Sequence, residues 1–216
     1  MLRIGALVSG GGTNLQAIID AISQGSIPDA KIEIVISNSK QAFALERAAK
    51  AGIATKIISR KEYASAQQFD LALSGELISR QVDLVLLAGF MAILGPKFFE
   101  HFENKVMNIH PALIPAFSGP GFYGLKVHEA VLEYGCKISG ASVHFVTAEV
   151  DAGPLILQKA VAVQEADTPV QLQKRIMEEA EWQIYPEAVR LFALGKLKVE
   201  GRQVSNSSRF KSDNRR

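Results

Sequence analysis

The 216-residue sequence has very little cysteine, no long apolar run and no strong excess of either charge. Its single cysteine, Cys136, excludes an internal disulfide and suits a reducing compartment. No apolar segment reaches membrane-spanning length and no signal peptide precedes the first strand pattern, so we expect a cytoplasmic protein that does not associate with membranes. A formal net charge of +2 does not indicate a nucleic-acid-binding protein.

Two common site motifs are also missing. The four histidines and the cysteine show no paired spacing such as His-x-x-x-His, so we expect no metal site. The glycine-rich segment that begins at Ser9 lacks the Gly-Lys-Ser/Thr of a P-loop. Leu15 stands where a dinucleotide fingerprint would have its third glycine, which disfavours a nicotinamide-dependent oxidoreductase.

The sequence does contain a regular alternation of apolar strands and amphipathic helices. Strands are expected at 2–8, 31–36, 55–58, 82–88 and 106–109, and helices at 13–23, 43–51 and 66–79. Continuous apolar strands that alternate with helices are typical of a mostly parallel sheet covered on both faces. Residues 1–110 therefore predict a doubly wound α/β half.

The second half, residues 111–200, has a different pattern. A helix is expected at 125–133, and two runs with only a turn region between them, 141–146 and 154–163, predict an antiparallel strand pair. A long helical segment follows Thr168 and is expected to kink or divide at Pro186. We expect one α/β domain over residues 1–200 and a flexible basic tail over 201–216.

The glycine-rich turn is the first candidate site. Gly10, Gly11 and Gly12 let the backbone approach an anion, and Thr13 and Asn14 open a helix whose N-terminal N–H groups are free. A phosphate-bearing ligand fits this position, although a simple tight turn with Thr13 as the helix cap is the alternative. The apolar loop at 87–96 follows a central strand, and either a flat heteroaromatic ring or a packed crossover would fit it.

The second candidate site combines Asn108, His110 and Asp151. Asn108 and His110 are two residues apart on an expected strand, so both side chains project to one face. Asn can donate a hydrogen bond, His can carry a proton, and Asp can hold a charged His, which together suit transfer of an acyl-type group without a metal. His144 is expected to support the site residues or the fold without touching a substrate, and His128 is expected on a helix surface without a role.

Several segments closely resemble the phosphoribosylglycinamide formyltransferases, which carry out a folate-dependent step of purine biosynthesis. The resemblance covers about residues 2–200, and it rests on SGGGTNLQAI (9–18), LAGFM (87–91), NIHPALIP (108–115), ASVHFVT (141–147), DAGPLILQ (151–158) and EWQIYP (181–186). The Asn-x-His and Asp set alone marks the wider group of enzymes that use 10-formyltetrahydrofolate.

The resemblance implies the formyltransferase fold, two small-molecule substrates and a role for each motif. It implies that the acceptor substrate, phosphoribosylglycinamide, contacts Gly12, Thr13, Asn14 and Glu181. The co-substrate 10-formyltetrahydrofolate would be held by Met91, Ala92, Ile93, Leu94, Asn108, Thr147, Ala148, Glu149 and Val150. Ala92 and Ala66 stand where relatives often have basic residues, so contacts to the glutamate tail of the folate stay open, as does homodimer formation.

The expected chemistry is direct formyl transfer by Asn108, His110 and Asp151. The amine of the acceptor attacks the formyl carbon, Asn108 and protonated His110 donate to the oxyanion, and Asp151 keeps His110 charged near pH 7. A 10-formyltetrahydrofolate hydrolase would use the same three residues with water as acceptor. A methionyl-tRNA formyltransferase would need an additional RNA-binding domain, and a non-catalytic nucleotide-binding module would not need the three residues at all.

Overall fold

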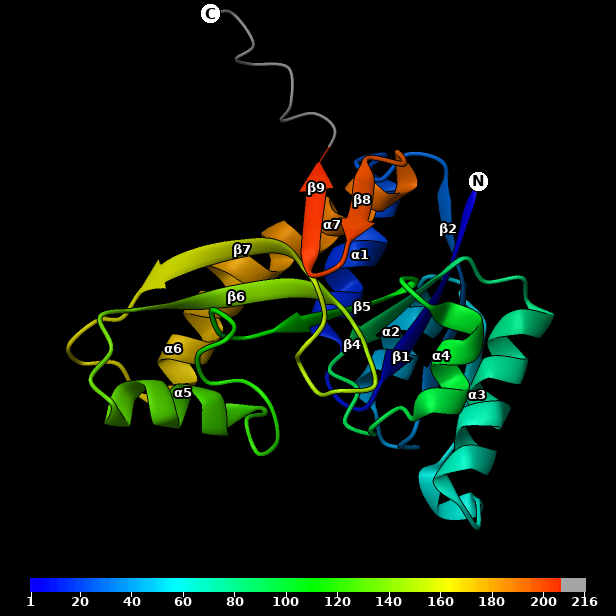
Figure 1. Ribbon diagram of the computed structural model, residues 1–216, viewed down its shortest axis with the longest axis horizontal. Helices are drawn as coiled ribbons and strands as arrows, with labels where there is room; N and C mark the ends of the chain where they lie inside the picture. Colours follow the sequence, from blue (N-terminus) through cyan, green and yellow to red (C-terminus); the bar gives the residue numbers. More distant parts are fainter. Residues whose placement is uncertain (207–216) are drawn as a thin grey trace, which may run out of the picture.

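A seven-stranded sheet organises residues 1–206, the part of the chain that this computed structural model describes (Figure 1). Its strands are β1 (Leu2–Val8), β2 (Ala30–Ser37), β3 (Thr55–Ile57), β4 (Leu84–Ala88), β5 (Val106–His110), β6 (Ile138–Phe145) and β7 (Leu155–Ala162). The spatial order is β3-β2-β1-β4-β5-β6-β7. The strands from β3 to β5 are parallel, and β6 and β7 run antiparallel to their neighbours.

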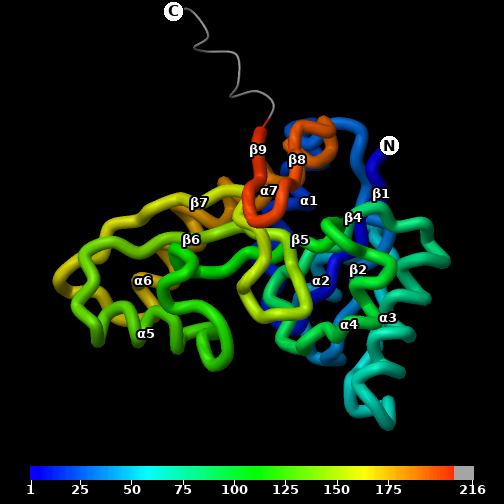
Figure 2. The backbone as a smooth tube through the Cα atoms, in the orientation of Figure 1, coloured from blue at the N-terminus to red at the C-terminus, as the bar shows by residue number. Residues whose placement is uncertain are grey.

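Helices cover both faces of this sheet. The pairs α3·α4 and α1·α7 each pack together, and α5 and α6 lie beneath β6 and β7 in the view of Figure 2. The helices are α1 (Thr13–Ser23), α2 (Phe43–Lys50), α3 (Ala66–Ser79), α4 (Pro96–Phe102), α5 (Leu125–Glu133), α6 (Pro169–Ile176) and α7 (Trp182–Ala193), with a short 3₁₀ turn, η1 (Arg60–Glu62), and a π-helical turn, η2 (Met177–Glu181).

Two apolar clusters hold the layers together. Ile4, Ala6 and Val8 of β1 face the cluster that includes residues of α1, α2 and α7, whereas Leu7 faces the cluster that includes residues of α3 and α4. Successive side chains of a strand point to opposite faces, so a central strand needs apolar residues at every position. Each large aliphatic side chain buried in this way contributes roughly 1.5–3 kcal/mol.

The strand order places two loops side by side. The chain proceeds from β1 outward to β3 and then returns to β4 on the other side of β1, so the carboxyl ends of β1 and β4 mark the point where the winding reverses. The glycine turn, residues 9–12, leaves β1 there, and the loop after Ala88 leaves β4. The Met91 N–H donates to the Ser9 hydroxyl oxygen at 2.8 Å, which joins the two loops. Open α/β sheets place their ligands at such a switch point.

The predicted fold is confirmed: the first half is doubly wound and parallel, and the expected strand pair forms β6 and β7. The sequence predicts that the helical segment kinks or divides at Pro186; a division at Pro186 is wrong, because Pro186 lies inside α7 and the segment divides instead at η2. A proline loses its hydrogen bond to the carbonyl four residues earlier, here that of Trp182. Trp182 begins α7, and the wide turn immediately before it takes up the distortion.

The first part of the predicted flexible tail, residues 201–206, is structured. Residues 201–206 are part of a hairpin made of β8 (Leu197–Glu200) and β9 (Gln203–Asn206). Its half-buried apolar side chains, which include Val199 and Val204, pack against the larger core, so this segment is held rather than frayed. The remaining tail residues, 207–216, lie outside the described residues. Within residues 1–206, no helix is long and apolar enough to cross a membrane.

Candidate active site

The two polar residues of β5 face a histidine on the neighbouring strand. In the antiparallel register of β5 and β6, Asn108 lies opposite His144 and His110 lies opposite Ser142. Because side chains two residues apart project to one face, Asn108 and His110 share the face that carries His144. The amide nitrogen of Asn108 is 3.2 Å from Nε2 of His144. The sheet register alone therefore fixes this contact.

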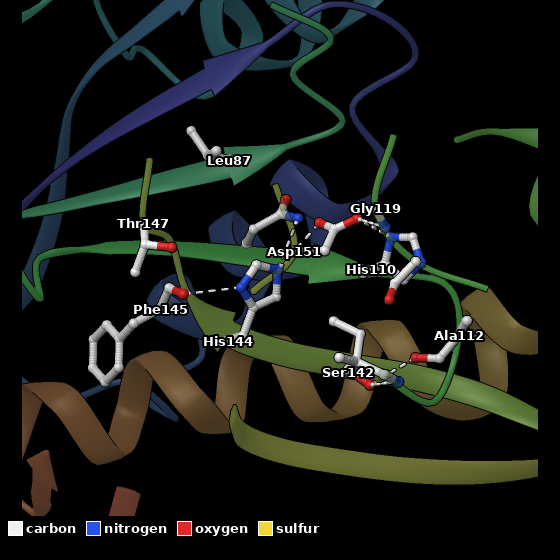
Figure 3. Close-up of polar contacts among 12 residues, drawn as sticks. Leu87, His110, Ala112, Gly119, Ser142, His144, Phe145, Thr147 and Asp151 are labelled. Carbon is white, nitrogen blue, oxygen red and sulfur yellow. Dashed lines mark hydrogen bonds and ion pairs between the residues drawn. The ribbon is translucent and has the colours of Figure 1, made fainter. Parts of the chain in front are cut away.

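Asp151 reaches both histidines from the loop between β6 and β7. Its backbone is left-handed with a φ of 53°, which Asp tolerates better than most residues do. Its Oδ2 accepts a hydrogen bond from the Gly119 N–H at 3.0 Å and lies 3.5 Å from Nδ1 of His110, while Oδ1 lies 3.6 Å from Nε2 of His144. Figure 3 shows the carboxylate beside the two rings. The three residues singled out from the sequence thus meet, together with His144.

Carbonyl groups fix which nitrogen of each ring carries a proton. His110 Nε2 is 2.8 Å from the Phe117 carbonyl oxygen, and His144 Nδ1 is 2.9 Å from the Phe145 carbonyl oxygen. A carbonyl can only accept, so both of these nitrogens donate. The nitrogen of His110 that remains for chemistry is therefore Nδ1. Nε2 of His144 faces both the Asn108 amide nitrogen, at 3.2 Å, and Oδ1 of Asp151, at 3.6 Å, so it accepts from the amide when the ring is neutral and donates to the carboxylate when the ring is protonated.

The charge of His110 differs from the expectation. Burial lowers the pKa of His110 below its usual value, and the neighbouring Asp151 carboxylate offsets only part of that effect. Burial would raise the pKa of Asp151, but contacts with His144, the Gly119 N–H and His110 together hold it below its usual value. At pH 7 the carboxylate is thus ionised and His110 is mostly neutral. The separation of 3.5 Å agrees, since charge-assisted hydrogen bonds are shorter, about 2.7–2.9 Å.

The glycine turn and the π-helical turn form a second polar cluster. Gly12 precedes α1 with a left-handed φ of 71°, and the Thr13 hydroxyl lies 3.8 Å from the sulfur of Met177. The Asn14 amide donates to Oε2 of Glu181 at 2.6 Å, and the other amide atom of Asn14, Oδ1, is buried without a hydrogen-bond partner among residues 1–206. Burial raises the pKa of Glu181 to about 7, which the contact with Asn14 opposes. The four residues expected to contact the acceptor substrate are therefore neighbours.

Eight of the nine residues expected to hold the folate lie on two loops, and the ninth, Asn108, lies on β5. In the first loop, Met91 and Ile93 expose 53% and 73% of their surface, whereas Leu94 is buried in the core with only its backbone left for a ligand. In the second loop, all four residues from Thr147 to Val150 are exposed, and the Thr147 hydroxyl donates to the Glu149 carbonyl. The second loop leads directly into Asp151.

Sequence reasoning understated two histidines. His144 contacts both Asn108 and Asp151 directly, and the signal for this was its alternation with Ser142 on a strand that pairs with β5. His128, expected on a helix surface, is fully buried, and burial lowers its pKa to about 4. Within residues 1–206, no cluster of three or more His, Cys, Asp or Glu side chains could hold a metal ion.

Comparisons with known proteins agree with this arrangement. The sequence profile of the family described as "Formyl transferase" matches residues 2–189. The chain is 42% identical over 200 residues to phosphoribosylglycinamide formyltransferase of Haemophilus influenzae, which covers 93% of this chain and 91% of that protein. It is also 42% identical over 197 residues to the human trifunctional purine biosynthetic protein adenosine-3, where the match covers 91% of this chain and only 19% of the longer protein.

A solved structure gives the same relationship in three dimensions. The crystal structure of glycinamide ribonucleotide transformylase 1 from Symbiobacterium toebii superposes with a TM-score of 0.90 and 48% sequence identity, and it covers 95% of this chain and 94% of that one. The mostly parallel sheet and its antiparallel extension are therefore those of the formyltransferase fold. The chain belongs to the formyl transferase family, and it is an enzyme of that family, a formyltransferase.

Proposed function

We propose that this enzyme transfers the formyl group of 10-formyltetrahydrofolate to the amine of 5-phosphoribosylglycinamide, a step of de novo purine biosynthesis. The observation that carries the proposal is the meeting of Asn108, His110 and Asp151 at 3.2–3.6 Å contacts around His144, on the strand next to β4. The names of the relatives support the choice of acceptor. A glycine-rich turn at a helix N-terminus and an exposed apolar loop, which meet at the switch point, support the use of two different substrates.

The acceptor substrate would bind at the glycine turn. Gly12, Thr13 and Asn14 present the N-terminal N–H groups of α1 to a phosphate, since the first N–H groups of a helix have no partner within the helix. Glu181, beside Asn14, would accept hydrogen bonds from the sugar or glycinamide part. The folate would lie between the loop that carries Met91 and Ile93, with Ala92 and Leu94 contributing backbone, and the exposed loop from Thr147 through Ala148 and Glu149 to Val150.

The reaction would proceed by direct attack. The acceptor amine forms a bond to the formyl carbon, and the Asn108 amide donates to the oxygen that becomes negative. Nδ1 of neutral His110 takes the proton that the new C–N bond makes acidic, directly or through one water. The same proton then passes to N10 of the folate as the bond between N10 and the formyl carbon breaks. The products are the formylated amine and tetrahydrofolate, without an enzyme-bound formyl group.

Asp151 would act on the charged form of His110. The carboxylate stabilises the imidazolium at the moment it forms, although burial keeps the ring neutral in the free enzyme. His144 would hold the Asn108 amide with an N–H directed at the formyl oxygen. General acid-base catalysis of this kind contributes about 10²–10⁴ in rate, and one oxyanion donor about 10²–10³.

One experiment separates this reaction from hydrolysis of the same folate. The enzyme is supplied with 10-formyltetrahydrofolate alone, with phosphoribosylglycinamide, or with charged initiator tRNA, and folate deformylation is followed. We expect turnover only with phosphoribosylglycinamide. Turnover with the folate alone would instead identify a 10-formyltetrahydrofolate hydrolase, and turnover with tRNA alone would identify a different acceptor. Asn108→Ala is the matched variant, for which we expect a rate about 10²–10³ lower.

A further inference from the structure

The glycine turn is held from outside by α2. The Ala44 N–H donates to the Gly10 carbonyl oxygen at 3.0 Å, and Nε of Arg47 donates to the Gly11 carbonyl oxygen at 2.8 Å. Gly12 packs so closely on α2 that an added Cβ would lie 2.5 Å from Cβ of Ala44. Two successive carbonyl groups of the turn therefore point at α2 and are satisfied there.

The position of these carbonyls determines where the N–H groups point. In a planar trans peptide the C=O and the N–H are antiparallel, so the Gly11 and Gly12 N–H groups face away from α2. Within residues 1–206, neither of these N–H groups donates to a protein acceptor. Together with the first N–H groups of α1, they form a row of free donors on the side away from α2. A carbonyl turned into that row would repel an anion.

Arg47 adds a charge that no carboxylate neutralises. Its guanidinium lies 5.0 Å from the ring centroid of Phe43, and Nη1 donates to Oε1 of Gln16 at 3.3 Å. The side-chain amide of Gln16 in turn donates to Oδ1 of Asp20 at 2.8 Å. Among the described residues, no acidic side chain lies within 4.0 Å of Arg47. A cation on the Gly11 carbonyl polarises that peptide group and makes the N–H of Gly12 a stronger donor.

We infer that Arg47 is a positioning residue for the phosphomonoester of the acceptor substrate. It acts from behind the glycine turn: it holds the Gly11 carbonyl away from the anion and keeps the N–H groups of Gly11 and Gly12 directed at it. The inference rests on the proposed function for the identity of the acceptor, but not for the geometry of the turn. Arg47 should therefore affect binding of the phosphate, and it should not affect folate binding or proton transfer.

The test compares Arg47→Gln and Arg47→Lys with a control on the same helix, Lys50→Gln. Lys50 lies over the same Phe43 ring, 5.9 Å from its centroid, and among the described residues no hydrogen bond joins its side chain to the turn. For Arg47→Gln we expect KM for phosphoribosylglycinamide to rise about tenfold or more, the low end of the effect of losing a hydrogen bond from a charged group. We expect kcat and KM for the folate to stay within about threefold, a smaller rise for Arg47→Lys, and no change for Lys50→Gln.

Inorganic phosphate gives a readout that does not depend on turnover. Phosphate should compete with the acceptor, and its inhibition constant should rise in Arg47→Gln by the same factor as KM. An unchanged acceptor KM in a folded Arg47→Gln enzyme overturns the inference. Parallel changes in kcat, both KM values and the thermal unfolding midpoint also overturn it, because they would indicate a merely structural role.

The same phosphate measurement separates this inference from the proposed function. If the wild-type enzyme does not formylate phosphoribosylglycinamide, direct titration with phosphate still compares wild type, Arg47→Gln and Lys50→Gln. Phosphate binding that is weaker only in Arg47→Gln supports the role of Arg47 although the acceptor is then wrong. Equal or absent phosphate binding in all three proteins overturns it.

Discussion

At the scale of single residues, His110 is subject to opposing influences that leave it neutral until substrate arrives. Burial disfavours its charged form, whereas the ionised Asp151 favours it. The Phe117 carbonyl fixes the proton of the neutral ring on Nε2 and leaves Nδ1 free. The ring is thus ready to accept a proton, and the charge it then acquires has a partner already in place.

Asp151→Asn is expected to change both the rate and its pH dependence. The neutral ring accepts the proton, so kcat/KM should fall as the pH drops below the pKa of His110, which lies under 6.5. Removing the carboxylate takes away the influence that raises this pKa, so the acidic limb should move to lower pH. The maximal rate should fall about 100-fold or more, because the imidazolium loses its partner. The measurement is kcat/KM from pH 5 to 8.

Asp167→Asn is the control for this variant, since it removes a carboxylate that pairs with Arg175 away from the three catalytic candidates. It should leave the pH profile unchanged. Full activity of Asp151→Asn across pH 6–8 would contradict the role assigned to Asp151.

His128 should make the fold sensitive to acid. Both of its ring nitrogens are buried without a hydrogen-bond partner in the described chain, and burial, with a smaller effect of His110, lowers its pKa to about 4. The unfolded chain takes up this proton near pH 6.5, so the unfolded state binds more protons between about pH 4 and 6.5. The contribution of His128 to the free energy of unfolding is therefore fully present above pH 6.5. It declines as the pH falls, by up to about 1.4 kcal/mol per pH unit.

We expect His128→Leu to remove this part of the decline, about 3 kcal/mol between pH 6.5 and 4. Urea unfolding at pH 4.5, 5.5, 6.5 and 7.5 measures it. His101→Leu, at an exposed histidine, is the control and should keep the wild-type slope. Equal slopes for the wild type and His128→Leu would show that His128 is not the group responsible.

At the scale of elements, the hairpin of β8 and β9 supports the loop that carries Asp151. The guanidinium of Arg202, in the hairpin turn, donates to the Ala152 carbonyl at 3.0 Å, next to Asp151. Gly153 is packed so closely that its Cβ would meet the Phe145 carbonyl at 1.7 Å. The loop is therefore held on one side by β6 and on the other by the hairpin.

Removal of the Arg202 contact should reduce turnover more than stability. One such hydrogen bond contributes about 0.5–1.5 kcal/mol, so we expect Arg202→Ala to lower kcat by about 2- to 12-fold. The thermal unfolding midpoint should change little, because the guanidinium is at the surface. Lys198→Ala is the control, since Lys198 forms an ion pair with Glu200 of the same hairpin. An Arg202→Ala enzyme with wild-type kcat would show that the hairpin does not position Asp151.

Some helices and strands could be predicted from the sequence, and others could not. The limits of Leu2–Val8 could be predicted because a continuous apolar run ends at a glycine-rich turn, and Ala66–Ser79 begins directly after Ser65, whose side chain caps the helix. The hairpin could not, because its short strands expose alternate polar residues in a basic, serine-rich context. The η2 turn could not either, since its residues continue the helical period and only a shift in hydrogen bonding separates it from α6 and α7.

The candidate site follows the same division. Asn108 and His110 could be paired from their spacing on one strand, whereas the part played by His144 depended on the register of β5 with β6. The neutral state of His110 could not be foreseen, because it depends on how deeply the ring is buried and not on the residues beside it in sequence. The role of Arg47 could not be predicted from the sequence, since its contact with Gly11 joins two separate strand-helix units.

At the scale of the whole molecule, the proposed substrates would connect both halves of the chain. The glycine turn belongs to the parallel half, and Glu181 and Asp151 belong to the second half. A ligand that binds only the folded protein at 100 times its Kd stabilises it by about 2.7 kcal/mol. For a protein of this size we expect phosphoribosylglycinamide at that excess to raise the unfolding midpoint by about 5–11 °C.

Differential scanning calorimetry with and without the ligand measures this shift, and the unphosphorylated glycinamide riboside is the matched control. The riboside should produce a much smaller shift at the same concentration. An equal shift with both compounds would mean that the phosphate contributes nothing to binding.

The register of β5 with β6 also limits how the site can move. The pairing of Asn108 with His144 is part of a hydrogen-bonded ladder, and the smallest slip that keeps both side chains on the same face is two residues, roughly 6–7 Å. A change of register between the two strands is therefore not available as a small adjustment during a catalytic cycle. Asp151 lies on a loop and not on the ladder. A shortening of its 3.5 Å separation from His110 can therefore come from movement of that loop against its contacts with β6 and the hairpin, without any change in strand register.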